Sequence, residues 1–409
     1  MTNKRQRIVG FTIAPASVVL AAAIACGWIR TPPIPFAWVF SLLASAFLAL
    51  SWAARNRIAR IALFNVALLS ALLAVTEGIA CWIQLRPASP PRPFYEVYFE
   101  ERTIAPPVPT QSDITPLMQP NDILGAVLHT NVQLWCWVYA GDRFVIRNQI
   151  QTTDGTGFRI PPPYHEERAQ GSILFFGCSF TFGAYINDQA AMPYRVGLKL
   201  QGNYRIHNFG VSSYGPHQML AQVEYGVVGR CVREPPRHII YQALPDHAYR
   251  ASGLRSYSRH SPRYAPGNDG RLVHTGSFAE WDKSHPKPPK GHLWETSFFI
   301  SKLLQGDEPA LHGKHIQTYV NIVQQSRNVL ATQYPDARFH ILFWDEPTRD
   351  ARRIERALRE AGLEVHRISD ILGPDYHGLK GSPRFVSRGH PRPEANAMIA
   401  DYAASRIIQ

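Results

Sequence analysis

Two residues far apart in the sequence, Ser179 and His390, have the side chains that acyl-transfer chemistry needs. Ser179 lies in the stretch "GCSFTFG", which directly follows the apolar run "SILFF". A Gly just before the Ser permits a tight turn where a strand ends, and the backbone N–H groups that follow can face an anion beside the Ser hydroxyl. His390 immediately precedes the last helical pattern of the chain. In an acyl-transfer site, such a His takes the Ser proton and later protonates the leaving group.

The stretch around Ser179 differs from three other sites that use a glycine-rich turn. It has neither the Lys-Ser or Lys-Thr pair of a phosphate-binding P-loop nor the glycine spacing of a dinucleotide-binding loop. It also lacks the Gly two residues after the Ser that defines a G-x-S-x-G nucleophile elbow. An ordinary turn is the alternative for each residue taken alone, since a His-Pro pair before a helix is usually only a turn.

The elements that must position these two residues follow an α/β pattern. After Gly171, short continuous apolar runs alternate with helical patterns, and such runs are typical of strands buried on both faces of a parallel sheet. The pattern predicts a three-layer α/β/α domain with a ligand site at the carboxyl ends of the strands. The expected strands are 172–176, 205–209, 238–244, 339–344 and 364–368, and the expected helices are 315–334, 350–361 and 393–407.

The motifs of this domain resemble those of the SGNH, or GDSL-type, hydrolase superfamily over residues 119–409. "FFGCSFTFG" is similar to the first block of that family, with Cys178 where Asp is usual. "HNFGVSSYGPHQML" resembles the second block, and "IIYQALPDHAYR" and "GHPRPEANAMIADY" stand in the places of the third and fifth. The resemblance is closest to membrane-anchored SGNH proteins of Gram-negative bacteria. It implies a flavodoxin-like α/β/α fold and a Ser-His esterase or acyltransferase with three oxyanion donors.

Carried over residue by residue, the resemblance implies that Ser179 is the nucleophile and the first backbone oxyanion donor, with His390 as the base. The second donor, usually the backbone N–H of a Gly, falls on Ser213. A backbone N–H does not require Gly, so this change is tolerable if the turn keeps its geometry. Gly210, in the same loop, is counted among the oxyanion and binding residues.

The Asn and Asp that the family usually has are both missing. The place of the Asn falls on Pro245 or Asp246. Pro245 has no N–H, and the ionised carboxylate of Asp246 would repel an oxyanion. His247 is therefore the alternative donor. Loss of one side-chain donor costs about 10²–10³ in rate elsewhere. The place of the Asp falls on Ser387. The acid that orients the His is then Asp345, after the fourth strand, or the site is a Ser-His dyad.

Several polar residues near these motifs have two interpretations. Asp188 and Asp370 are weaker candidates for the orienting acid. Arg250 binds a substrate carboxylate or pairs with Asp246, and His217 lines the site or begins a helix. The His residues lack metal-ligand spacing, so the sequence predicts no metal and no cofactor.

The first 85 residues have the character of a membrane anchor. Three apolar stretches, 8–29, 35–54 and 61–85, are each long enough to cross a bilayer as a helix, which takes about 20 residues. Cationic residues precede the first stretch and separate the second from the third, so the positive-inside rule predicts a cytoplasmic N-terminus and an exported C-terminal part. The sequence therefore predicts a bacterial inner-membrane protein with a periplasmic domain. A signal peptide ending near Cys26 is the alternative for the first stretch.

The remainder of the chain divides into three parts. Residues 86–118 are rich in Pro and predict an extended linker. Residues 119–168 alternate Val, Ile and aromatic residues, which predicts a small β-rich segment packed on the main domain. Residues 169–409 form the α/β domain, and an insertion at 250–292 contains an expected hairpin around Gly270.

Composition narrows the class of partner. The 409 residues carry a formal net charge of +12, with 18% charged and 45% hydrophobic residues. A positive balance suits nucleic acid, a membrane or an anionic glycan, but no zinc-finger spacing or RNA-binding signature is present, so no nucleic-acid partner is expected. Five Cys are too few for a disulfide scaffold, although a bond between Cys136 and Cys231 is conceivable.

The residues and the resemblance together predict a membrane-anchored periplasmic serine esterase or acyltransferase. Its expected substrate is an ester, an O-acetyl group on an envelope glycan, and its intermediate is acyl-Ser179. A second interpretation, favoured by the missing Asn and Asp, is a catalytically degenerate SGNH domain that binds glycan or serves as an assembly component. A third is a lysophospholipid or thioester hydrolase at the membrane surface.

Overall fold

The computed structural model describes residues 35–54, 56–85, 94–100, 117–140, 143–285, 310–387 and 389–408. The chain divides into two compact units, residues 1–92 with 287–310 and residues 93–286 with 311–409. The second unit contains every described strand and both residues of the candidate catalytic pair.

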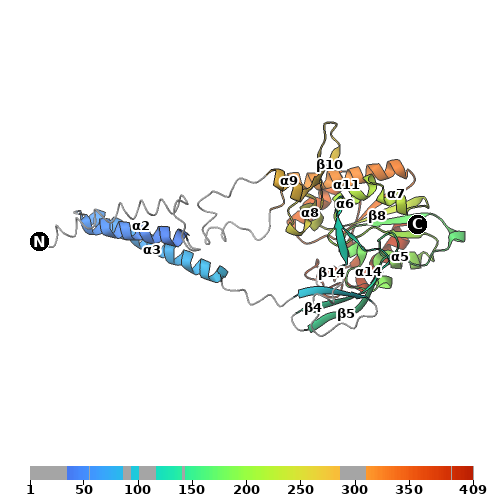
Figure 1. Ribbon diagram of the computed structural model, residues 1–409, viewed down its shortest axis with the longest axis horizontal. Helices are drawn as coiled ribbons and strands as arrows, with labels where there is room; N and C mark the ends of the chain where they lie inside the picture. The colour runs from blue at the N-terminus through green and yellow to red at the C-terminus, as the bar shows by residue number, and fades with distance from the viewer. Residues whose placement is uncertain are drawn as a thin grey trace. The chain divides into compact units, whose positions relative to one another are not determined.

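Two apolar helices make up the described part of the first unit: α2 (Pro35–Ala53) and α3 (Arg57–Leu85). They run side by side (Figure 1). By length and composition, one described stretch could cross a membrane, Arg57–Ile79 within α3, whereas the apolar part of α2 is shorter. The structure therefore does not confirm three spans, and the first expected span, 8–29, lies outside the described residues.

A five-stranded parallel sheet forms the centre of the second unit, and its strand order is β12–β11–β8–β6–β7. Numbered along the chain from the opposite edge, this is the 2-1-3-4-5 order of flavodoxin-like doubly wound folds. The predicted α/β class and its parallel sheet are confirmed. The bounds are β6 (Ser172–Phe176), β7 (Arg205–Asn208), β8 (Pro236–Ala243), β11 (Arg338–Phe343) and β12 (Glu364–Arg367).

Helices cover both faces of the sheet because alternate residues of each strand face opposite sides. Leu174 and Phe176 of β6 belong to one buried apolar cluster, and Ile173 and Phe175 belong to a second. The first cluster includes residues of α6 (Pro216–Glu224), α11 (Gly313–Gln333) and α12 (Arg349–Glu360), and the second includes residues of α5 (Met192–Lys199), α13 (Ile368–Leu372) and α14 (Pro393–Tyr402). The result is three layers (Figure 1).

Two small antiparallel sheets precede the parallel one. The first has the order β1–β4–β5, formed by Phe94–Glu100, Gln133–Ala140 and Arg143–Thr152, and the second is the hairpin β2–β3, formed by Met118–Asn121 and Gly125–Leu128. β1 falls within 86–118, where the Pro content indicated an extended linker. The stretch "FYEVYFE" contains no Pro and is rich in aromatic residues, which favour strands, and it pairs with β4 along its whole length.

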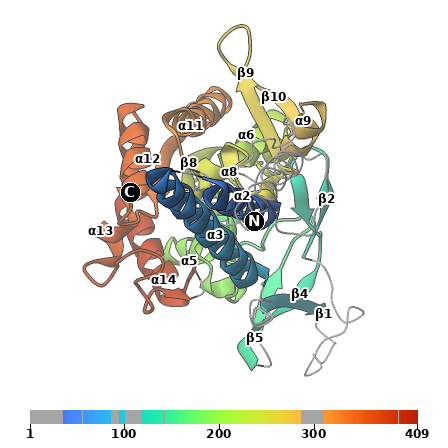
Figure 2. The same cartoon turned by 90° about the vertical axis from the view of Figure 1, so that its left-hand side faces the viewer.

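The insertion after β8 contains a hairpin and a helix: β9 (Pro262–Pro266), β10 (Leu272–Ser277) and α9 (Phe278–Ser284). Its turn includes Gly270, as expected from the sequence, and the hairpin extends away from the sheet (Figure 2). The conceivable disulfide between Cys136 and Cys231 does not form.

Candidate active site

Ser179 and His390 meet at the carboxyl ends of the parallel strands. The Nε2 atom of His390 lies 2.9 Å from the Oγ atom of Ser179, although 211 positions separate the two residues. Ser179 begins the short helix α4 (Ser179–Phe182) directly after β6 and is 8% exposed. His390 lies in β14 (His390–Pro391) just before α14 and is half-buried. This is the separation at which an imidazole can take a serine proton.

The turn that presents Ser179 requires the Gly before it. Gly177 has a φ of 152°, and a Cβ at this position would collide with Thr181 Oγ1 and lie 2.9 Å from the Gln242 carbonyl oxygen. The Thr181 hydroxyl donates a hydrogen bond of 2.8 Å to the Gln242 side chain on β8. The turn is therefore anchored to the neighbouring strand, which limits the movement of the Ser179 side chain.

A second anchor comes from the end of β7. The Asn208 side chain donates to the Thr181 carbonyl at 3.0 Å and accepts from the Gly210 N–H at 3.1 Å. Gly210 packs so closely on α4 that a Cβ there would lie 2.8 Å from the Phe182 nitrogen. The structure thus gives Gly210 a packing role, with its N–H already bonded inside the protein, rather than the predicted oxyanion or binding role.

Ser213 has a backbone conformation that favours glycine. Its φ is 67°, in the left-handed region, and its N–H donates to no acceptor within the described part of the chain. The N–H of Ser179 stands at the first position of α4, where a helix offers no acceptor of its own. Both backbone groups therefore remain available to an oxyanion.

Aromatic rings hold the His390 imidazole in place. The Tyr185 ring centroid lies 4.7 Å away at an interplanar angle of 80°, and the Phe180 centroid lies 5.3 Å away. Tyr185 also has a positive φ of 66°, and strained backbone of this kind concentrates at functional sites. Neither aromatic residue was predicted from the sequence as part of the site. A Tyr six residues after the nucleophile belongs to no motif, and its contact with His390 depends on the loop that follows α4.

That loop is held by a single buried cation, Arg159. Its guanidinium donates to the carbonyl oxygens of Gly183 and Ile186, the latter at 2.6 Å, and to the Asp188 carboxylate at 2.7 Å. Arg159 is 2% exposed. Asp188, a weaker candidate for the acid that orients His390, is used in this ion pair instead. Arg159 positions the loop that carries Tyr185, a role that the sequence motifs did not predict.

Asp345, the predicted orienting acid, has another partner. Its Oδ1 accepts a hydrogen bond of 2.9 Å from the backbone N–H of Ser369, at the start of α13. No contact joins Asp345 to His390 among the described residues, although both lie near the carboxyl edge. Ser387, at the place of the usual Asp, pairs directly with His390 across the β13–β14 bridge (Val386–Ser387 with His390–Pro391).

Asp246 is ionised and surrounded by donors. Its carboxylate accepts hydrogen bonds from Arg250 at 2.7 Å, Arg255 at 2.6 Å and Tyr257 at 2.7 Å. Burial raises the pKa of Asp246, but the two guanidinium groups and the Tyr257 hydroxyl outweigh it and lower the pKa to about 2. Asp246 therefore cannot donate to an oxyanion. Of the two roles expected for Arg250, a substrate contact or an ion pair with Asp246, the structure shows the ion pair. Arg250 also donates to the Tyr214 carbonyl at 2.7 Å, next to Ser213.

Two buried histidines lie near this ion pair. His217 and His247 are both completely buried, and burial lowers the pKa of His217 to about 3 and that of His247 well below its usual value. His247 Nδ1 lies 2.7 Å from the Tyr241 hydroxyl. The other His247 nitrogen and both His217 nitrogens have no hydrogen-bond partner within the described residues. Both rings are neutral, so neither supplies a positive charge to the site.

A mostly apolar cavity of about 380 Å³ lies beside the Ser213 loop. Its lining includes Val211 and Tyr214 from that loop, Leu124 from the turn between β2 and β3, and Arg230. Neither Ser179 nor His390 lines it, so it adjoins the loop of the candidate oxyanion donor rather than the reacting pair.

Comparison with known proteins gives no match to a family model and no match among curated proteins. Among solved structures, the chain is similar to a member of the lipolytic protein G-D-S-L family from Veillonella parvula. The identity is 12%, the TM-score 0.32, and the match covers 58% of this chain and 98% of that one.

Two esterases that act on carbohydrates match with similar identity and TM-score. An acetyl xylan esterase from the rumen bacterium Butyrivibrio proteoclasticus shares 13% identity at a TM-score of 0.32, covering 69% of this chain and 72% of that one. A carbohydrate esterase described as having divergent catalytic and non-catalytic binding functions shares 13% identity at a TM-score of 0.28, covering 63% and 69%. At TM-scores this low, the similarity supports no conclusion about this chain.

Proposed function

We propose that this protein is an SGNH-type serine hydrolase or acyltransferase that acts on an ester. The observation that carries the proposal is the 2.9 Å approach of His390 Nε2 to Ser179 Oγ. It occurs at the carboxyl ends of a parallel sheet with the 2-1-3-4-5 strand order, where doubly wound folds bind their ligands. The resemblance of the sequence motifs to the SGNH blocks supports the same assignment.

The proposed reaction has two halves. In the first, Ser179 Oγ attacks the ester carbonyl while His390 Nε2 takes the hydroxyl proton, and the carbonyl oxygen becomes an oxyanion that the N–H groups of Ser179 and Ser213 stabilise. The C–O bond to the alcohol then breaks, and the His390 imidazolium returns its proton to that alcohol. In the second half, a water or acceptor hydroxyl gives its proton to His390 Nε2 and attacks the acyl-serine carbonyl. The bond to Ser179 Oγ then breaks, the His390 imidazolium returns its proton to Ser179 Oγ, and the acid or the new ester leaves.

The proposed site uses the Ser179–His390 pair with two backbone donors. Asp345 caps α13, and Asp246 is occupied by Arg250 and Arg255. The ring contacts of Phe180 and Tyr185 restrict the His390 imidazole. We expect a slower enzyme than one with an Asn as third oxyanion donor, since a missing donor costs about 10²–10³ in rate.

For the substrate and setting, we propose an O-acyl group on an envelope glycan and attachment to the bacterial inner membrane with the α/β unit in the periplasm. The membrane-length stretch Arg57–Ile79 and the asymmetry of cationic residues between the apolar stretches support the anchoring. The net charge of +12 suits an anionic polymer.

One observation favours a second candidate, a glycan-binding domain without catalysis. Where the family usually has an Asn donor, Pro245 has no N–H and the Asp246 carboxylate is ionised. A site with weak oxyanion stabilisation binds its ligand without turning it over. Labelling of the serine separates the two candidates.

The test uses the full-length chain in detergent micelles, a fluorophosphonate probe and p-nitrophenyl acetate. The proposal expects wild-type protein to label and to hydrolyse the ester, and Ser179→Ala to do neither. Cys178→Ala is the matched control, because it removes the buried neighbouring thiol and leaves the hydroxyl. Labelling that persists in Ser179→Ala would overturn the assignment of the nucleophile, and a folded wild-type protein that never labels would favour the binding role.

A further inference from the structure

Three histidines form a row across the neighbouring strands β8, β11 and β12. His238, His340 and His366 are each the third residue of their strand, in β8, β11 and β12. The ring centroids of His238 and His340 lie 5.7 Å apart, and those of His340 and His366 lie 5.6 Å apart. Because the strands are parallel and their register is set by the backbone ladder, the row belongs to the rigid part of the fold.

A carboxylate completes the row. Glu364 is directly opposite His340 in the register, and His366 follows two residues later, so all three side chains face the same side of the sheet. His340 Nδ1 lies 3.3 Å from one Glu364 oxygen, and His366 Nε2 lies 3.1 Å from the other. One donor atom from each residue lies within 4.8 Å of the other two. Two imidazoles and one carboxylate are a preferred ligand set of Zn²⁺.

His340 is 4% exposed, and neither ring nitrogen has a hydrogen-bond partner within the described residues, although Nδ1 approaches Glu364 to 3.3 Å. A buried ring nitrogen of this kind is unusual unless something else coordinates it.

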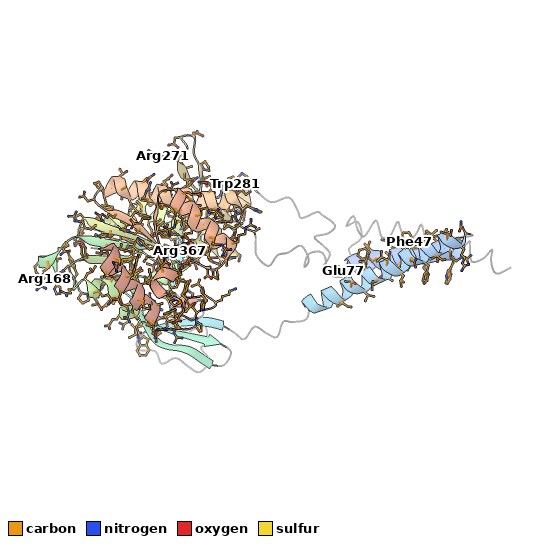
Figure 3. The ribbon with its side chains drawn as sticks, turned by 180° about the vertical axis from the view of Figure 1, so that it is seen from behind. Phe47, Glu77, Arg168, Arg271, Trp281 and Arg367 are labelled. Atoms are coloured by element: carbon orange, nitrogen blue, oxygen red, sulfur yellow. The ribbon has the colours of Figure 1, made fainter. Side chains whose placement is uncertain are left out.

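The surroundings orient the ligands and leave the carboxylate available. His366 Nδ1 lies 2.9 Å from the Tyr402 hydroxyl on α14, an outer contact that directs Nε2 toward Glu364. Arg367, the next residue of β12 (labelled in Figure 3), faces the other side of the sheet and pairs with Glu355 of α12 at 2.8 Å. The Glu364 carboxylate is mostly exposed, so water can fill the remaining coordination positions.

We propose that His340, Glu364 and His366 form a binding site for a divalent transition metal, with Zn²⁺ as the best-suited ion. His340 Nδ1, His366 Nε2 and the Glu364 carboxylate are the ligands. The bound ion joins β11 to β12 and, through Tyr402, to α14, the helix that follows His390. Its role is structural, because its ligands lie on β11 and β12, which β8 separates from β6, the strand that leads to Ser179. The site is independent of the proposed esterase activity.

The test titrates Zn²⁺ into the full-length chain, first freed of metal with a chelator, in competition with a chromophoric chelator. We expect about one bound equivalent and a rise in Tm with Zn²⁺. His366→Ala and Glu364→Gln should each weaken the binding at least about tenfold, and Tyr402→Phe by about tenfold, because outer contacts of metal ligands contribute about 10–100-fold. The matched control is His312→Ala, an exposed histidine on the N-terminal side of α11, which should bind like wild type.

A second readout separates loss of the site from loss of the fold. Co²⁺ in place of Zn²⁺ should give visible d–d absorption in wild type and not in His366→Ala, while far-UV circular dichroism stays unchanged. The exposed Glu364→Gln change preserves the size of the side chain, so it serves if the alanine variant fails to fold. Wild-type protein that binds no Zn²⁺, or folded His366→Ala and Glu364→Gln that bind it as tightly as wild type, would overturn the proposal.

Discussion

The Asp345 carboxylate accepts a hydrogen bond of 2.9 Å from the backbone N–H of Ser369, and so caps α13 instead of orienting His390. The sequence predicted Asp345 as the orienting acid because it follows the fourth strand of the sheet. The structure therefore assigns Asp345 to the cap of α13.

We therefore predict that Asp345→Ala keeps most of the esterase activity. The variant should lose about 1 kcal/mol of stability from the cap, and kcat/KM should fall less than tenfold. Steady-state kinetics with p-nitrophenyl acetate and urea unfolding measure the two effects. His390→Ala is the reference and should lower kcat at least about 10³-fold. If Asp345→Ala lost as much activity as His390→Ala, Asp345 would be the orienting acid after all.

Ser213 should tolerate loss of its side chain but not of its N–H. Because its φ is 67°, Ser213→Gly relieves a left-handed conformation and should raise the free energy of unfolding by about 0.5–1 kcal/mol, with activity kept. Ser213→Pro removes the N–H and should abolish activity. Ser212→Gly is the matched control, since Ser212 is not among the residues with positive φ, and it should destabilise. A loss of activity in Ser213→Gly would assign the catalytic role to the hydroxyl.

Arg159 should be essential to the loop that holds Tyr185 against His390. Removing the guanidinium in Arg159→Met leaves the buried Asp188 carboxylate unpaired, which typically costs about 3–5 kcal/mol. Arg159→Lys keeps the charge but cannot reach all of the carbonyl acceptors, so we expect it to fold and to lose activity through a lower kcat. Arg205→Met, at a half-exposed surface ion pair, is the control and should change little. Wild-type kcat in Arg159→Lys would contradict the positioning role.

The stability of the α/β unit should fall between pH 6.5 and pH 4. Burial lowers the pKa of His207 and His238 to about 4 and that of His217 to about 3, against 6.5 in the unfolded chain. In this window the unfolded chain binds more protons than the folded one, so acid favours unfolding by up to about 1.4 kcal/mol per pH unit for each His. Above pH 6.5 these groups add no pH dependence.

Urea unfolding followed by Trp fluorescence at pH 7, 6 and 5 measures this slope. His217→Gln removes one of the three groups, so the slope of the unfolding free energy against pH should fall by the equivalent of about one proton. A wild-type protein equally stable at pH 5 and pH 7 would show that these rings are protonated in the folded state.

The sequence by itself determined the α/β layering and the position of the nucleophile along the chain. The runs at 172–176 and 339–344 are apolar without interruption, and only a strand covered on both faces buries every residue of such a run. Gly177 before Ser179 marks the turn because few other residues adopt its φ of 152°. These features depend on neighbours along the chain, so local pattern was sufficient.

The sequence motifs predicted the pair of Ser179 and His390, and the tertiary structure brings the two side chains to 2.9 Å across 211 positions. Only the tertiary structure showed that Arg255 joins Arg250 on Asp246 and that Arg159 binds the loop after the nucleophile. His340, Glu364 and His366 are separated by up to 26 positions and show no ligand spacing in the sequence, yet the parallel register of β11 and β12 brings their donor atoms within 4.8 Å. Such contacts depend on strand register and on which loop packs beside which, and these are set by the burial of the whole core rather than by any short stretch of the chain.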